Sequence, residues 1–261
     1  MIHRGSRHAE IAPPPSAAPP APERRGLNGL FFNAAETGRL FSLMNPVFVP
    51  GEGLVVEFIG ANRDEGVSTL ARDFALMASQ YVDGLVLLLD FDWRRNEHYD
   101  HFQTAAKDYP MIAPGPPLAL EADFGRLLRP SHPSSETEQP PKPPLTFHRL
   151  GATSLVISRP VPDLTDAPRL VNQPEFWADL RRSVMLTVVD APPAARSFDG
   201  IVMCGAMDAV ILVAAAETTR VPVIVELHEK LAAQGAPVVG IILNKRRFYI
   251  PKWVYGFLSR A

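Results

Sequence analysis

Short apolar runs recur along the chain, and they are continuous rather than alternating with polar residues. Runs of this kind, rich in leucine, valine and isoleucine, are typical of strands that are buried on both faces of a sheet. They occupy residues 54–59, 85–89, 155–158, 186–189, 209–213 and 238–243. Six short buried strands are therefore expected.

Helical spacing of apolar residues occurs between these runs. Leu70 and Phe74 fall on one side of a helix, and Pro222 stands in the first turn of another, where its missing N–H costs nothing. Helices are predicted over residues 27–44, 68–80 and 221–234. Apolar strands alternating with helices predict an α/β fold, with a mainly parallel sheet and helices on both faces. In such sheets ligands bind at the carboxyl ends of the strands.

Proline content divides the chain. The 27 prolines concentrate at residues 12–22 and 130–144. The first stretch predicts a disordered, Pro-rich tail over residues 1–26, and the second predicts a flexible insertion near 130–144. Both are interpreted as linkers, with a docking motif as the alternative. The remaining residues, 27–261, are expected to form one domain.

Charge and cysteine content exclude several classes of protein. The net charge of −2 gives no basic field for nucleic acid, and the single Cys204 excludes an internal disulfide framework. The first residues lack the apolar core of a signal peptide, and no run approaches the roughly 20 apolar residues of a membrane span. These features predict a cytoplasmic protein unless a partner holds it elsewhere.

A glycine-bounded turn joins the first apolar run to the helix that follows. Gly60 and Gly66 bracket this turn, and Ser68 and Thr69 open the helix. Such a turn directs several backbone N–H groups and the positive end of the helix dipole to one point, which is typical of phosphate binding. Where a phosphate loop carries its lysine, however, this chain has Val67, which offers neither charge nor donor.

Acidic residues stand at the ends of two predicted strands. Asp90 and Asp92, followed by Arg94, end one strand, and Asp190 ends another. Mg²⁺ prefers oxygen ligands, so Asp90, Asp190 and the Ser68 hydroxyl are the predicted metal ligands. Asp92 and Asp90 are the predicted catalytic residues, and Asp92 is predicted to polarise an attacking water or hydroxyl, as in phosphoryl transfer. Helix capping is the alternative role for each acid taken singly. We expect Asp92 and Asp190 to be solvent-accessible, without partners in the core.

Taken in order, these motifs resemble those of the bacterial tyrosine autokinases (BY-kinases), the cytoplasmic kinases of capsule and exopolysaccharide export. The segment from Leu87 to Arg94 resembles their second Walker motif. Residues 188–193 resemble their Walker B motif, and residues 65–69 resemble their phosphate loop. Residues 240–244, which end in Asn244, resemble a later strand whose terminal asparagine contacts the nucleotide base in that family. Glu36-Thr37-Gly38-Arg39 resembles the front of their oligomerisation motif, with Ser42 in place of its second arginine. The resemblance extends over residues 33–258.

The resemblance implies a P-loop NTPase fold of the MinD/ParA-like group, with ATP or ADP and Mg²⁺ as cofactors. It also implies a membrane-embedded polysaccharide co-polymerase or chain-length regulator as partner, which would place the chain peripherally at the inner membrane. A homo-oligomer would form through Glu36 and Arg39. Gly60, Gly66, Ser68, Thr69 and Asn244 are the nucleotide-binding residues that it implies.

The chain departs from the family pattern in three respects. Val67 removes the phosphate lysine, and Asp64 replaces a glycine that lets the loop backbone approach phosphates. The C-terminal tyrosine cluster is absent, with only Tyr249 and Tyr255 near the end. Losing a preorganised cation at a transferring phosphoryl group costs several kcal/mol of barrier. Asp64 and Glu65 are further expected to add negative charge beside the phosphates.

Three functions are consistent with these features. The first is a pseudokinase or regulatory adaptor of polysaccharide synthesis with weakened nucleotide binding. The alternative is an active tyrosine autokinase or ATPase in which Arg63 or Arg72 substitutes for the lysine. The third is a positioning ATPase of the MinD/ParA type, which usually has two loop lysines where this chain has none. The basic, aromatic stretch at residues 245–258 is expected to meet the membrane or a partner, to cover the nucleotide base, or to pack on the sheet.

Overall fold

The computed structural model describes residues 52–93, 97–129, 145–161 and 169–246, together with three helical positions, Gly38, Leu40 and Ser42. Several predicted features lie outside these residues. They are the Pro-rich tail, the insertion near 130–144, Arg94, Glu36, Arg39, most of the helix predicted over 27–44, and the C-terminal stretch beyond Arg246.

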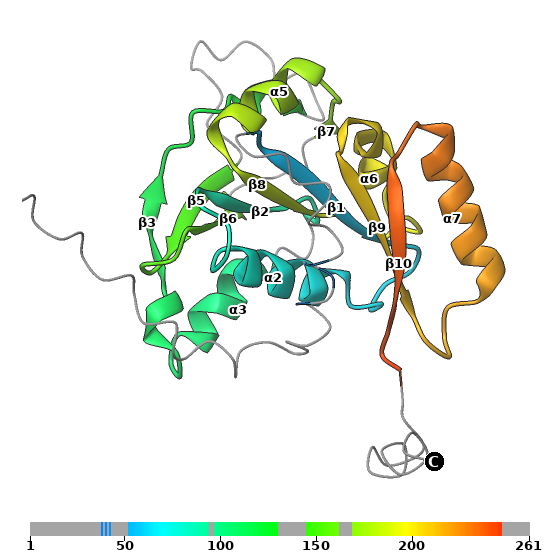
Figure 1. Cartoon of the computed structure of the whole chain (residues 1–261), viewed down its shortest axis with the longest axis horizontal. Helices are drawn as coiled ribbons and strands as arrows, with labels where there is room; N and C mark the ends of the chain where they lie inside the picture. The colour runs from blue at the N-terminus through cyan, green and yellow to red at the C-terminus, as the bar shows by residue number, and fades with distance from the viewer. Residues whose placement is uncertain are drawn as a thin grey trace, which may run out of the picture.

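An eight-stranded sheet forms the centre of the molecule (Figure 1). Its strands follow one another across the sheet in the order β10 (Val238–Asn244), β9 (Ala209–Ala215), β1 (Leu54–Gly60), β8 (Leu186–Asp190), β2 (Val86–Asp90), β6 (Leu155–Pro160), β5 (Leu145–Leu150) and β3 (Pro114–Leu118). The strands from β10 to β6 are parallel, and β5 runs antiparallel to both of its neighbours.

Helices cover both faces of the sheet. One face carries α2 (Val67–Ala78) and α3 (His98–Ala105), and the other carries α5 (Pro174–Ser183), α6 (Asp199–Met203) and α7 (Val221–Ala233) (Figure 1). Smaller elements are the 3₁₀ turns Pro110–Ile112 and Cys204–Ala206, α4 (Phe124–Leu127), and a two-stranded sheet of β4 (Leu128–Arg129) and β7 (Arg169–Leu170).

A separate hydrophobic core fills the space on each side of the sheet. One core includes Phe58 of β1, Phe74 of α2 and Phe102 of α3, and the other includes Phe176 and Trp177 of α5. All five side chains are almost completely buried. Successive side chains of a strand point to opposite faces of the sheet. Because helices cover both faces here, apolar residues are needed at successive positions of a central strand.

The predicted mainly parallel α/β sheet with helices on both faces is confirmed, and each predicted strand is present. The strands β5 and β3 were not predicted. Three of the five residues of β3 are prolines, which read as a loop in the sequence and are tolerated here because β3 is an edge strand. No helix in the described part of the chain has the length and apolar character that crossing a membrane requires.

Candidate functional site

A cavity of about 250 Å³ lies where the carboxyl ends of the central strands meet the start of α2. The register of the sheet brings its acids together, because Asp90 at the end of β2 pairs directly with Asp190 at the end of β8. The remaining wall comes from the loop between β1 and α2. The cavity is lined by Asn62, Arg63, Asp64, Glu65, Gly66, Val67, Ser68, Thr69, Arg72, Asp90, Asp92, Glu97, His98, Ala191, Pro193, Arg196 and Lys245.

The loop between β1 and α2 has the tight, left-handed turns of a phosphate-binding loop. Gly66 caps α2 with φ of 91°, and Asp64 also has positive φ, of 60°. At Gly60, a Cβ atom would lie 2.5 Å from Glu65 Oε2 and 2.9 Å from Val67 Cγ2, so only glycine fits. Ser68 is exposed to the cavity at the first turn of α2. The predicted nucleotide-binding residues from Gly60 to Thr69 therefore lie together, from the end of β1 through the loop to the first turn of α2.

Glu65 lines the cavity and also holds the loop together through its side chain. Its side chain is buried, and Oε2 accepts a hydrogen bond of 3.0 Å from the Asn62 backbone N–H. Oε1 accepts from the side chains of Asn62 and Thr219. The Asn244 side chain donates to the Glu65 carbonyl oxygen at 2.9 Å. Asn244 thus ties β10 to the loop; its predicted contact with a nucleotide base stays a prediction.

Val67 borders the cavity, but its side chain is part of the hydrophobic core. Its side chain is only 6% exposed and packs with the cluster beneath α2, beside Phe58 and Ala71. The position is therefore apolar in its surroundings as well as in its residue type. Arg63, the cationic side chain of this loop, is exposed and lines the cavity.

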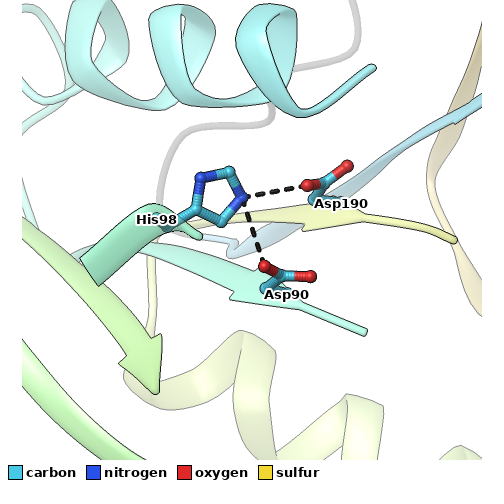
Figure 2. Close-up of side chains that lie close together, drawn as sticks. All are labelled: Asp90, His98 and Asp190. Atoms are coloured by element: carbon cyan, nitrogen blue, oxygen red, sulfur yellow. Dashed lines mark hydrogen bonds and ion pairs between the residues drawn. The ribbon is translucent and has the colours of Figure 1, made fainter. Parts of the chain in front are cut away.

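Asp90 and Asp190 face a histidine that sequence analysis did not identify (Figure 2). His98, the first residue of α3, places Nε2 2.9 Å from Asp190 Oδ2 and 3.6 Å from Asp90 Oδ2. Its Nδ1 lies 3.3 Å from a guanidinium nitrogen of Arg72 on α2. All three residues drawn in Figure 2 are buried, each about 1% exposed.

The burial of this cluster shifts its acid–base properties. Burial raises the pKa of Asp90 well above its ordinary value, and the neighbouring Asp190 carboxylate raises it further. The backbone N–H of Asp92, which donates to Asp90 Oδ1 at 2.7 Å, acts in the opposite direction. Burial also lowers the pKa of Arg72, while the surrounding carboxylates oppose that change. The two acids are therefore partners in one buried network.

Asp92 lies at the same edge but faces a different cation. It forms an ion pair with Arg196, in the segment that follows β8, and both side chains are mostly buried. The expectation that Asp92 and Asp190 are solvent-accessible and lack partners was therefore wrong. Strand-end acids do reach the surface of a bare sheet, but here α3 and the segment after β8 cover them.

His98 and Arg196 are the members of the site that sequence analysis missed. Arg196 lies six residues after Asp190, within the predicted site region, but no motif singles it out. His98 lies eight residues after Asp90 with no strand or glycine turn to mark it. The only local signal is its position after the Asp-x-Asp segment, at the start of the next helix.

The arrangement does not fit a hydrated Mg²⁺ ion at Asp90 and Asp190. Mg²⁺ requires near-octahedral oxygen ligands and retains several waters. Here the carboxylate oxygens that face each other are both directed at the imidazole nitrogen of His98. The predicted ligands Asp90 and Ser68 line the cavity, whereas Asp190 is buried beside Asp90, and both acids already face the imidazole of His98.

Solved structures with a similar fold include two kinase domains. The kinase domain of VpsO matches with a TM-score of 0.51 and 22% identity, over 82% of this chain and 95% of that one. The kinase domain of the Escherichia coli tyrosine kinase ETK matches with a TM-score of 0.53 and 15% identity, over 94% of this chain and 85% of that one. No protein-family model and no curated protein matches the sequence. The chain therefore has the P-loop fold of the bacterial tyrosine kinase domains, as the resemblance of its motifs indicates.

Proposed function

We propose that this chain is a BY-kinase-like pseudokinase, a regulatory adaptor of exopolysaccharide or capsule synthesis and export. The observation that carries the proposal is Val67, which stands buried where the phosphate loop of an active kinase carries its lysine. A preorganised cation at that point supplies several kcal/mol of transition-state stabilisation. Without it, the loop can hold a phosphate through its backbone but cannot stabilise its transfer.

The state of the acids supports the same proposal. Asp92, assigned the base-like role, is paired with Arg196, and Asp190 is bonded to His98. A general base must be within hydrogen-bond reach of the proton that it removes, with a free acceptor oxygen. Both predicted catalytic residues are engaged by neighbouring groups, Asp90 by the backbone N–H of Asp92 and Asp92 by Arg196.

Nucleotide binding is expected to be retained but weak. Four cationic side chains line the cavity, Arg63, Arg72, Arg196 and Lys245, against five acidic ones. An ATP or ADP phosphate chain would therefore meet a surface without net positive charge. The backbone N–H groups at the start of α2 and the helix dipole remain, and they favour an anion.

Docking is the function that remains for such a fold. We propose that a membrane-embedded polysaccharide co-polymerase or chain-length regulator recruits the chain to the inner membrane, and that self-association involves Glu36 and Arg39. The domain over residues 27–261 would carry this role, with residues 1–26 as a tail and the segment near 130–144 as an insertion. Co-fractionation with membranes, with and without the candidate partner, tests recruitment.

An active enzyme is the second candidate, and one observation favours it. The Arg72 guanidinium lines the cavity beside Asp90 and Asp190, where a substitute cation would have to lie. ATP hydrolysis by the wild type and by Arg72→Met separates the two functions. We expect no hydrolysis above background from either protein. Turnover by the wild type that Arg72→Met abolishes would establish the second function instead.

A further inference from the structure

His98 lies among charged side chains, of which two carboxylates and one guanidinium contact its ring. Two carboxylates, Asp90 and Asp190, lie on neighbouring strands, and each is about 1% exposed. Like charges at such a separation in a buried site cannot both remain ionised without a counter-charge. In enzymes with this fold a metal ion supplies that charge. In this chain a cationic side chain, Arg72, lies on the other side of His98.

The hydrogen bonds of His98 assign its proton. A guanidinium group can only donate, so the contact of Arg72 with Nδ1 makes Nδ1 an acceptor without a proton. In the neutral ring the proton is then on Nε2, which donates to Asp190 Oδ2 at 2.9 Å. The result is a chain of hydrogen bonds in which Arg72 donates to His98 and His98 donates to Asp190. Asp90 Oδ2 lies 3.6 Å from the same Nε2.

This chain of hydrogen bonds also opposes the use of His98 as a metal ligand. A metal on Nε2 would need the proton to move to Nδ1, where it would meet the Arg72 donor at 3.3 Å. Two donors facing each other at that distance repel, so Arg72 would have to leave. One feature favours a cation: Asp190 Oδ1 is buried and has no hydrogen-bond partner among the described residues. Direct measurement of cation binding therefore decides the question.

We propose that Arg72 and His98 replace the divalent cation at Asp90 and Asp190, so that the pocket takes a nucleoside di- or triphosphate in its metal-free form. The nucleotide in this statement rests on the function proposed above. The replacement of the cation does not, since it concerns side chains of the chain alone. Figure 2 shows one nitrogen of the histidine ring directed at both acids.

Titration of the full chain with Mg²⁺, Mn²⁺ and Zn²⁺ tests the replacement directly. Calorimetry should detect no binding of these cations, and the melting temperature should be the same in EDTA as with each cation. Binding of any of them to the wild type at this cluster, shown by its loss in Asp190→Asn, would overturn the proposal. This arm needs no variant that alters His98, and so it holds even if such variants fold poorly.

Removal of the histidine should restore a demand for metal. We expect His98→Ala to melt at a lower temperature in EDTA and to regain stability with Mg²⁺ or Mn²⁺, because the two acids then lack the imidazole N–H that faces them. Arg72→Met should also gain cation binding. His101→Ala, on the exposed side of the same helix, is the matched control and should behave as the wild type. If His98→Ala and Arg72→Met fold but bind none of these cations, His98 and Arg72 do not replace a metal ion at this site.

Affinity for ADP, measured with and without Mg²⁺, completes the test. The wild-type Kd should differ by less than about twofold between EDTA and Mg²⁺, whereas His98→Ala should bind at least about tenfold more tightly with Mg²⁺. A wild-type preference of tenfold or more for Mg²⁺ would overturn the proposal. Absence of ADP binding in every buffer would instead contradict the proposed nucleotide site, and the cation titrations would still decide the role of Arg72 and His98.

Discussion

Val67 shows how one residue changes the properties of a whole loop. A lysine at this position must bring its ammonium group to the phosphates, but the surroundings of Val67 are the apolar side chains beneath α2. The side chain contributes to stability through burial instead of contributing charge to the cavity. Restoring the lysine therefore affects packing and binding in opposite directions.

Val67→Lys should strengthen ADP binding and destabilise the fold. The added cation favours the phosphates, while an ammonium group forced into an apolar site and the longer stem cost about 1–3 kcal/mol of unfolding free energy. Denaturant unfolding and calorimetry measure the two effects. Val67→Met, of similar length but uncharged, is the matched control: it should lose stability without gaining affinity. An equal gain in affinity by Val67→Met would show that loop shape, not charge, limits binding.

Glu57 is a second residue whose surroundings conflict with its charge. It lies inside β1, completely buried, and neither carboxylate oxygen has a hydrogen-bond partner among the described residues. Burial raises the pKa of Glu57 well above its ordinary value. Gly200 leaves the space that this carboxyl group needs, because a Cβ there would lie 2.7 Å from Glu57 Oε1. The folded chain therefore retains the proton of Glu57 to a higher pH than the unfolded chain does.

The stability of the protein should fall as the pH rises because of Glu57. Above about pH 4.3 the unfolded chain releases the proton that the folded chain retains, so ionisation favours unfolding until the raised pKa is reached. Glu57→Gln removes this effect. Its stability relative to the wild type should increase by about 1.4 kcal/mol per pH unit across that window. Unfolding at about pH 5 and about pH 7 measures the change.

Glu52→Gln provides the control for this titration, since Glu52 is exposed. Its stability relative to the wild type should not change with pH. A difference between Glu57→Gln and the wild type that is also constant with pH would mean that Glu57 ionises in the folded chain.

At the scale of elements, the junction of β1, α2 and β10 depends on Gly66. This residue has φ of 91°, and a Cβ there would lie 2.1 Å from the side-chain nitrogen of Asn244. Asn244 holds the loop through the Glu65 carbonyl group. A side chain at position 66 would therefore displace the strand-end asparagine and the loop together.

Gly66→Ala should consequently cost more than backbone strain alone and should weaken ADP binding. Gly235→Ala is the matched control, because Gly235 also has positive φ, of 76°, but nothing lies within 4 Å of its Cβ position. The control should lose about 1 kcal/mol, from the conformational strain of a non-glycine residue. Thermal and denaturant unfolding give the comparison. Equal losses in the two variants would indicate that the Asn244 contact has no energetic role.

The same elements show what the sequence could and could not predict. The pairing of Asp90 with Asp190 follows from two apolar runs that end in acids, because parallel strands end at the same edge. His98 could not be found in this way, since 92 residues separate it from Asp190 and no periodic pattern links them. Its position depends on how α3 packs. The edge strand β3 was missed because its prolines obscure the apolar pattern.

At the scale of the whole molecule, Cys204 reports on the integrity of the fold. It is the only cysteine in the sequence, and it is completely buried. Burial, together with the nearby Glu57 carboxyl group, raises the pKa of its thiol to about 12. The native thiol is therefore both inaccessible and protonated, whereas the reactive species is the thiolate.

Labelling of Cys204 by a thiol reagent should thus proceed only as fast as the protein unfolds. A ligand that binds the folded state should slow labelling further, by mass action. We expect ADP to slow it modestly, in keeping with weak binding. Mass spectrometry of the labelled chain follows the rate. Rapid labelling under native conditions would show local opening around α6 without global unfolding.

The central claim is that a tyrosine kinase fold is retained here without phosphoryl transfer. The most direct test is incubation of the full chain with γ-labelled ATP and Mg²⁺, followed by measurement of label on the protein. The account predicts no phosphotyrosine above that of a heat-denatured control, because Val67 replaces the phosphate lysine and Asp92 is held by Arg196. Label on Tyr249 or Tyr255 that accumulates with time would contradict it.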